Sequence, residues 1–184
     1  MTPIGNGRLL RSAGIGHVVE LDWWQSAGEV PLPITLTPAQ HFSSRRMVDR
    51  NRALWGGFLI AAGGRRILFA GDSGYGPHFR EIGARLGPID LALLPIGAYE
   101  PRWFMKDIHM NPAEAVQAHL DLAARQSIAM HFGTLQLTPE GIDEPVRELA
   151  QALRERGVPA ERFRTVEVGE SVYIHRSAAV SPLC

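Results

Sequence analysis

Three side chains of the types that bind metal ions each follow an apolar segment of the sequence. Asp72 follows ILFAG, His131 follows SIAM, and His41 follows a short apolar run broken by a proline. Taken singly, each has a structural alternative, because an aspartate between glycines can cap a turn and a lone histidine at a strand end often makes structural hydrogen bonds. His and Asp are also ligands that a hydrolytic zinc ion prefers. The repetition therefore predicts a metal site.

A fourth residue, His109, lies in KDIHMNPAEA just before a predicted helix start. It could contact a substrate phosphate or a leaving group, or it could be an ordinary histidine of a surface loop. His119, in the helix that follows, is expected on an exposed or half-buried face. Other reaction signatures are missing, since the sequence has no G-x-S-x-G, Walker, G-x-G-x-x-G or C-x-x-C motif. Its one cysteine, Cys184, is the last residue and a poor nucleophile candidate.

The elements that would position these residues alternate between strand and helix. Two apolar runs around Gly63 and Gly64 predict a β-hairpin. Asn111, followed by a proline and an acidic first turn, predicts a helix that runs to about Arg125. Further strands are expected at residues 17–24, 34–38, 89–95, 127–131, 164–168 and 171–175, and further helices at 77–86 and from Thr138 or Asp143 to Gly157. This order predicts an α/β fold with helices packed on a sheet, and its polar residues lie where such sheets carry active sites.

Composition limits the class of protein. The chain has 184 residues, 45% of them hydrophobic and 21% charged, which suits one globular domain. The formal net charge is zero, so no long-range field favours nucleic acid. No apolar stretch approaches the ~20 residues of a transmembrane helix, and residues 1–16 lack the apolar core of a secretory signal. These features predict a cytoplasmic protein, either free or peripheral to a membrane, with an irregular start at 1–16 and a loose tail at 176–184.

Long motifs around the candidate ligands resemble one enzyme family. The segments PAQHFSSRRMVDRNRALWGGFLI, FAGDSGYGPHF, DLALLPIGAYEPRWFMKDIHMNPAEAVQAH and AMHFGTLQLTPE are similar to N-acylphosphatidylethanolamine-hydrolysing phospholipase D and its bacterial relatives. These proteins belong to the metallo-β-lactamase superfamily. The resemblance extends from about residue 16 to residue 153, which is most of the chain.

The resemblance implies an αββα sandwich with two zinc ions between its sheets. By position, His41 and His131 resemble terminal ligands of different zinc ions, Asp72 resembles the carboxylate that bridges both, and His109 resembles a histidine of the substrate pocket. Asp72 and His109 are therefore the candidate catalytic residues. The residues that match the family's pocket-forming loop, together with His109 the candidate substrate-binding set, are Tyr99, Glu100, Arg102 and Trp103.

One family motif is absent from the sequence. The family's H-x-H-x-D-H segment supplies four further ligands, and no two histidines here have its spacing. Each zinc ion would then have at most two protein ligands, whereas a catalytic zinc needs three and a water. Residues 1–184 are accordingly expected to form a single partial domain, the carboxy-terminal part of the fold. Cutting the sandwich there exposes the inner face of a sheet, through which the chain could form a homodimer.

Two functions remain open on these grounds. The first is a zinc-dependent hydrolase whose full-length parent cleaves a small-molecule or lipid phosphodiester, with no transmembrane segment and no nucleic-acid partner. The second is a truncated, catalytically inactive fragment, or a partner-binding remnant without a complete metal site.

Overall fold

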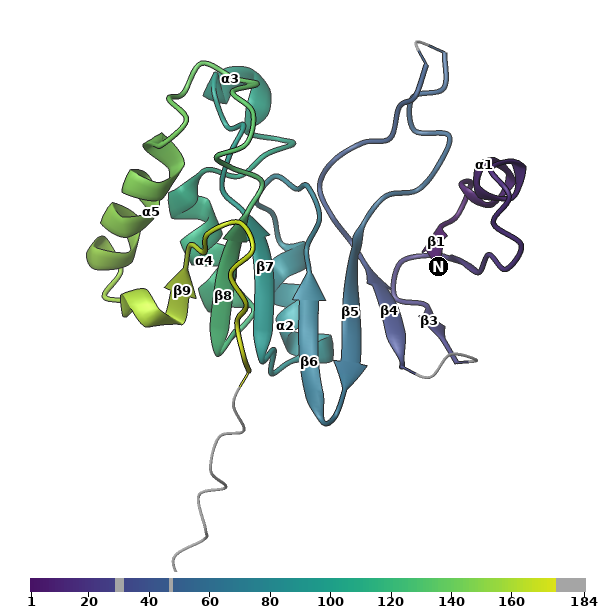
Figure 1. The fold of residues 1–184 in the computed structure, drawn as a ribbon, viewed down its shortest axis with the longest axis horizontal. Helices are drawn as coiled ribbons and strands as arrows, with labels where there is room; N and C mark the ends of the chain where they lie inside the picture. The colour runs from purple at the N-terminus through teal and green to yellow at the C-terminus, as the bar shows by residue number, and fades with distance from the viewer. Residues whose placement is uncertain (29–31, 47, 175–184) are drawn as a thin grey trace, which may run out of the picture.

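The computed structural model describes residues 1–28, 32–46 and 48–174. Its main sheet has seven strands that lie side by side in chain order (Figure 1). Both His175 and the expected tail at 176–184 lie outside the described residues. The strands of this sheet are β3 (Ser26–Ala27), β4 (Ile34–Thr37), β5 (Gly57–Ala62), β6 (Arg65–Phe69), β7 (Leu91–Pro95), β8 (Gln126–Met130) and β9 (Phe163–Arg164).

The main sheet is antiparallel at one side and parallel at the other. Strands β3 to β6 are antiparallel neighbours, and β5 and β6 form the expected hairpin around Gly63 and Gly64. Strands β6 to β9 are parallel neighbours joined by helical connections. Because two antiparallel steps separate β4 from β6, strands β4, β6, β7, β8 and β9 all run in one direction. Their carboxyl ends therefore meet at one edge of the sheet.

Three helices cover one face of the sheet. They are α2 (His78–Leu86), α4 (Pro112–Asp121) and α5 (Glu144–Glu155), and α2 and α4 lie behind the strands in Figure 1. The strand residues under them form one row across the sheet, which links Leu59, Leu68, Ala92, Ser127 and Phe163 in register. All members of this row are at most 5% exposed. This face holds the main hydrophobic core of the described chain.

The opposite face is covered only in part. Leu21 and neighbouring residues of the amino-terminal segment pack over β4 and the start of β5. Farther along, Leu91 is buried, but several other apolar side chains of this face remain half-buried or exposed, and Phe69 is 44% exposed. We call these residues the open sheet face: Ile60, Ile67, Phe69, Leu93 and Ile128.

Several sequence expectations need correction. Residues 1–16 are not irregular, since they contain β1 (Thr2–Pro3) and α1 (Gly7–Ser12). The strand expected at 17–24 shrinks to β2 (Glu20–Leu21), which pairs with β1. Residues 171–174 form no strand. His119 is 2% exposed rather than surface-facing, because its Nδ1 lies 2.8 Å from the buried Ser127 Oγ.

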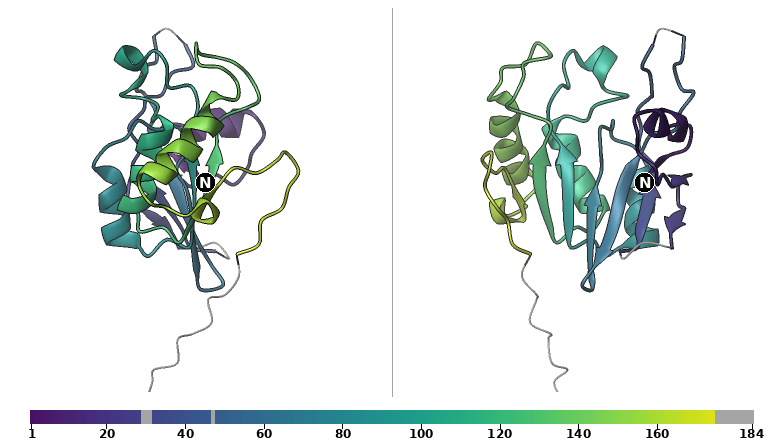
Figure 2. Two further views of the ribbon diagram at one scale, coloured as in Figure 1. Left: turned by 90° about the vertical axis from the view of Figure 1, so that its left-hand side faces the viewer. Right: turned by 45° about the vertical axis from the view of Figure 1, so that its right-hand side comes forward.

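Two short helical elements complete the fold. They are α3 (Arg102–Met105), which lies in the connection from β7 to α4, and a 3₁₀ turn (Ala160–Arg162) before β9. Within the described residues, we find no helix with the length and apolar character that crossing a membrane requires. The two further views in Figure 2 show that α3 and the loop between β8 and α5 rise beyond the sheet at the edge where the parallel strands end.

Candidate metal centre

Four polar side chains predicted from the sequence come together at the carboxyl edge of the sheet. His41 follows β4, Asp72 follows β6, His109 lies between β7 and α4, and His131 directly follows β8. The His109 ring lies with its centroid 5.2 Å from that of His41 and 5.2 Å from that of His131. His131 Nε2 lies 3.7 Å from Asp72 Oδ1. We call these four residues the polar cluster.

The hydrogen bonds of His41 leave one ring nitrogen available. Its Nδ1 lies 3.0 Å from the carbonyl oxygen of Phe42, so Nδ1 carries the proton and donates it. Nε2 then presents a lone pair, and it is buried without a hydrogen-bond partner among the described residues. Histidines that bind metals usually have this arrangement, with one nitrogen bonded to a carbonyl and the other facing the ion.

His109 is the most buried member of the polar cluster, at 8% exposed. Burial, together with the neighbouring rings of His131 and His41, lowers the pKa of His109 to about 4. Its Nδ1 also lacks a hydrogen-bond partner within the described part of the chain. A neutral ring thus stands between the two other histidines.

The backbone at His131 is strained. Its φ is 59°, in the left-handed region that residues with a Cβ seldom adopt. Such conformations persist where the surrounding structure holds them, and they gather at functional sites. The turn aims the His131 ring toward Asp72, whose side chain is 45% exposed.

The donor types of the polar cluster suit a zinc ion, but their number is incomplete. The histidines His41 and His131 and the carboxylate of Asp72 are of the types that ordinarily bind zinc. His41 also has a buried nitrogen without a hydrogen-bond partner among the described residues. Across residues 1–28, 32–46 and 48–174, however, no group of three or more His, Cys, Asp or Glu residues is arranged to hold a metal ion by itself. The polar cluster fits part of a metal centre, and the remaining ligands would have to come from elsewhere.

The start of the predicted pocket loop, at Tyr99 and Glu100, is fastened to the loop after β8. The backbone N–H groups of Tyr99 and Glu100 both donate to the buried carboxylate of Glu140. Burial raises the pKa of the Tyr99 hydroxyl, and the nearby Glu148 of α5 raises it further. The Tyr99 side chain is buried, and its hydroxyl has no hydrogen-bond partner among the described residues. Sequence reasoning missed Glu140, which lies far from Tyr99 along the chain.

Arg102 and Trp103 differ in their contacts, since Arg102 is hydrogen-bonded within its loop and Trp103 is exposed. The Arg102 guanidinium makes two hydrogen bonds, of 3.0 and 2.8 Å, to the carboxylate of Glu114. It also donates to the carbonyl oxygens of Tyr99 and His109. Arg102 is thus engaged in holding the loop that carries His109. Trp103, on α3, is 87% exposed.

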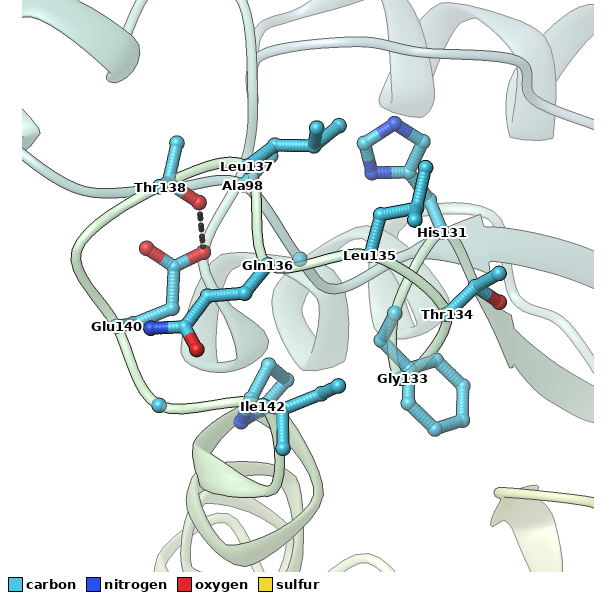
Figure 3. A pocket seen from close by; sticks show the side chains of 14 residues that line it. Ala98, His131, Gly133, Thr134, Leu135, Gln136, Leu137, Thr138, Glu140 and Ile142 are labelled. Carbon is cyan, nitrogen blue, oxygen red and sulfur yellow. Dashed lines mark hydrogen bonds between the residues drawn. The ribbon is translucent and has the colours of Figure 1, made fainter.

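A cavity of about 270 Å³ opens beside His131. Figure 3 shows the His131 ring and the hydrogen bond between Thr138 and Glu140 on opposite sides of it. Its wall is formed largely by the loop after β8, including the apolar side chains of Leu135 and Leu137. Sequence reasoning included this loop in a family motif but assigned no role to any of its residues after His131.

Sequence reasoning also missed a set of residues directly behind the polar cluster. Gln40, Ser73 and His78 connect the loops that carry His41 and Asp72. The available signal was the position of Ser73, inside the GDSG motif and next to a predicted ligand.

Comparison with known proteins finds one matching family and similar phospholipases. Residues 6–132 match the family described as the beta-lactamase superfamily domain. The chain is 42% identical over 180 residues to N-acyl-phosphatidylethanolamine-hydrolyzing phospholipase D 1 of Caenorhabditis elegans, covering 91% of this chain and 51% of that protein. It is 38% identical to the mitochondrial N-acyl-phosphatidylethanolamine-hydrolyzing phospholipase D of Saccharomyces cerevisiae, covering 93% of this chain and 38% of that protein.

The fold is shared with solved structures. Igni18, a metallo hydrolase from Ignicoccus hospitalis, superimposes with a TM-score of 0.67 at 24% identity, over 93% of this chain and 66% of that one. The chain spans about half the length of the C. elegans relative. The mixed sheet, the helices on one of its faces and the match over residues 6–132 agree, and the chain belongs to the β-lactamase superfamily.

Proposed function

We propose that this chain is the carboxy-terminal part of a zinc-dependent hydrolase that cleaves a phosphodiester, with a phospholipid as the favoured substrate. The observation that carries the proposal is the convergence of the polar cluster from four separate loops, with His41 Nε2 buried and unpaired within the described residues. An unpaired buried nitrogen costs free energy unless a ligand satisfies it. Similarity to two N-acyl-phosphatidylethanolamine-hydrolyzing enzymes supports the substrate class.

In this proposal His41, Asp72 and His131 are the residues of this chain that would hold zinc. When bound, zinc would supply Lewis acidity at a phosphoryl oxygen and lower the pKa of a water. His109 lies between the rings of His41 and His131, so its ring would lie next to a substrate bound at the metal. The Glu114–Arg102 pair keeps His109 in place through the His109 carbonyl.

The cavity beside His131 would receive part of the substrate. Its wall combines apolar side chains, among them Leu135, Leu137 and Ile142, with the hydroxyls of Thr134 and Thr138. Pockets that bind small molecules commonly combine an apolar lining with a few polar groups. This composition supports a substrate with an apolar part next to its phosphate. Such a protein would work in the cytoplasm, at or near a membrane surface.

The test uses the chain joined to an upstream segment that carries H-x-H-x-D-H. Zinc content is measured, and hydrolysis is followed with an N-acyl phosphatidylethanolamine and with a simple phosphodiester. We expect bound zinc and turnover, and we expect His41→Ala, Asp72→Ala and His131→Ala each to lower turnover by at least about a hundredfold. His17→Ala is the matched control, because His17 is exposed and outside the polar cluster. A metal-free, inactive wild-type protein would contradict the proposal.

A second candidate is a catalytically inactive fragment that binds a partner, in the simplest case another copy of itself. The open sheet face favours it, since exposed contiguous apolar surface marks an interface. Metal analysis of the 184-residue chain separates the two. Turnover with tightly held zinc would exclude the second candidate.

A further inference from the structure

Behind the polar cluster, one hydroxyl group joins the loops that carry two of its members. Ser73 directly follows Asp72 and is 1% exposed. Its Oγ accepts a hydrogen bond of 2.9 Å from the backbone N–H of Gln40, the residue before His41. The same oxygen lies 2.7 Å from the carbonyl oxygen of Gly74 and 3.1 Å from Nε2 of His78.

These three contacts fix the direction of each hydrogen bond. A serine hydroxyl has one proton to donate and two lone pairs to accept. The carbonyl of Gly74 can only accept, so it receives the hydroxyl proton. The N–H of Gln40 occupies one lone pair, and His78 must then donate from Nε2 to the other. His78, the first residue of α2, therefore completes a fully satisfied buried group.

The backbone adds further links at the same point. Gly74 N–H donates to the Gln40 carbonyl, and Met110 N–H donates to the Ser73 carbonyl. The Gln40 side chain donates to the carbonyl oxygen of Asp107. A Cβ at Gly74 would come within 2.7 Å of the Asp107 backbone, so only glycine permits this approach. The loops of His41, Asp72 and His109 are thus fastened together through Ser73 and its two neighbours.

A second buried serine–histidine pair in the same molecule lacks these links. His119 of α4 lies 2.8 Å from Ser127 of β8, and both residues are at most 2% exposed. This pair has the same chemical groups and comparable burial. It lies between a helix and the middle of the sheet, away from the loops that carry the polar cluster. It therefore offers an internal comparison.

We propose that Ser73 and His78 are positioning residues that set the placement of His41 relative to Asp72. The inference rests on the proposal that those two side chains act together as metal ligands. Neither Ser73 nor His78 contacts substrate or metal in this arrangement. Their effect passes through the Gln40 backbone to His41 and through the chain to Asp72.

The test compares Ser73→Ala with Ser127→Ala in the 184-residue chain. Amide hydrogen exchange at Gln40 and the ring Cε1–H resonances of His41 are measured by NMR without added metal. Zn²⁺ affinity is measured separately by calorimetry. We expect Ser73→Ala to speed Gln40 exchange about tenfold after correction for global stability and to move the His41 ring resonance. Ser127→Ala should lower stability by a similar amount and leave both signals in place.

Each outcome decides the matter. If Gln40 exchange and the His41 resonance respond equally to the two substitutions, the positioning role is wrong. If Zn²⁺ fails to bind even the wild-type chain, the proposed metal site in this chain is weakened, while the NMR comparison still decides the role of Ser73. Where Zn²⁺ binds, we expect its dissociation constant to rise about tenfold in Ser73→Ala alone.

A second pair of variants covers the case in which Ser73→Ala does not fold. His78→Gln keeps an N–H donor near Ser73, whereas His78→Phe keeps the ring shape without one. We expect His78→Gln to retain most of the wild-type Gln40 protection and His78→Phe to lose it. His119→Phe serves as the matched control. Equal loss in both His78 variants would overturn the assigned hydrogen bond.

Discussion

At the scale of single residues, histidines in this chain do two different kinds of work. His41 and His109 each have a buried ring nitrogen without a hydrogen-bond partner among the described residues. His78 and His119 are instead each hydrogen-bonded to a buried serine. The first arrangement suits ligand binding, since an unmet hydrogen-bonding group is costly without a ligand. The second stabilises the fold at neutral pH and makes it sensitive to acid.

One part of the pH dependence of stability comes from His119. Burial, together with the nearby Arg162, lowers the pKa of His119 to about 4, against a value near 6.5 in the unfolded chain. The unfolded state thus binds a proton first as the pH falls, so the stability that the neutral ring provides above about pH 6.5 is lost progressively down to about pH 4. We expect the wild-type protein to lose about 2 kcal/mol more than His119→Phe between about pH 7.5 and about pH 4.5. Urea unfolding at both pH values measures this. An equal loss in both proteins would contradict it.

Arg102 should matter for stability as well as for the loop that it holds. Arg102→Ala removes an ion pair in which one guanidinium nitrogen contacts both carboxylate oxygens of Glu114, together with two hydrogen bonds to loop carbonyls, so we expect a loss of about 2 kcal/mol in the free energy of unfolding. Arg102→Lys should recover little of it, because a single ammonium group cannot replace two guanidinium nitrogens, one on the Glu114 carboxylate and the other on the loop carbonyls. The control is Arg164→Ala, which breaks an exposed pair with Glu170 and should cost under about 1 kcal/mol. Chemical denaturation separates these outcomes.

At the scale of elements, the sequence predicted those parts whose signals are local. The hairpin, β4, β7, β8, α2 and α5 all lie where apolar runs and turn residues placed them. The predictions fail at the ends of some elements. The start of α1 is held by the Glu20 side chain, which accepts from the N–H groups of Gly5 and Gly7, and nothing near Gly7 reveals this. Helix α4 ends at Asp121 rather than near Arg125, because Ala123 adopts a left-handed φ of 49°.

The site shows the same division. His41, Asp72, His109 and His131 could be picked out because each follows or precedes a recognisable element and lies in a family motif. For Ser73 the only signal was its place in the GDSG motif, and nothing in the sequence singled out His78 or Glu140, because the importance of these residues lies in contacts made in the folded chain. Most of these contacts join segments that lie far apart in the sequence, so a local sequence pattern does not reveal them.

The β5–β6 hairpin gives a prediction about backbone conformation alone. Gly64 has a φ of 74°, and a Cβ added there would meet nothing within 4 Å. Any cost of Gly64→Ala therefore comes from the left-handed backbone, and we expect about 1 kcal/mol in the free energy of unfolding. Gly64→Asn should cost less, because asparagine tolerates this region. Thermal unfolding of both variants provides the measurement, and a greater loss with Asn would contradict the conformational explanation.

At the scale of the whole molecule, the two faces of the sheet are unequal. One is closed by α2, α4 and α5, and the other leaves Phe69 and its neighbours on β7 and β8 accessible. Apolar area that water still contacts favours association by roughly 25 cal/mol per Å² once it is covered. The face therefore offers a surface for another part of a longer protein or for a second copy.

Association of the 184-residue chain should depend on this face. We expect Phe69→Lys to shift the protein toward monomer by at least about tenfold in the dimer dissociation constant, because a charge would be buried in an apolar interface. Leu120→Lys is a matched control, since Leu120 is 43% exposed and lies on α4, on the other side of the sheet. Sedimentation velocity over a range of concentrations gives the comparison. A wild-type chain that is monomeric throughout, or equal effects of both variants, would exclude a dimer through this face.

The strand order has a consequence for how the protein is made. Each strand from β3 to β9 lies beside the one that precedes it in the chain. A nascent chain leaving the ribosome can therefore add each strand to an edge that already exists, without waiting for a later segment to be inserted between earlier ones. His41, Asp72, His109 and His131 would reach their shared edge one after another, in the order of translation. On this route the polar cluster is complete once β8 and the turn at His131 have emerged, before α5 is synthesised.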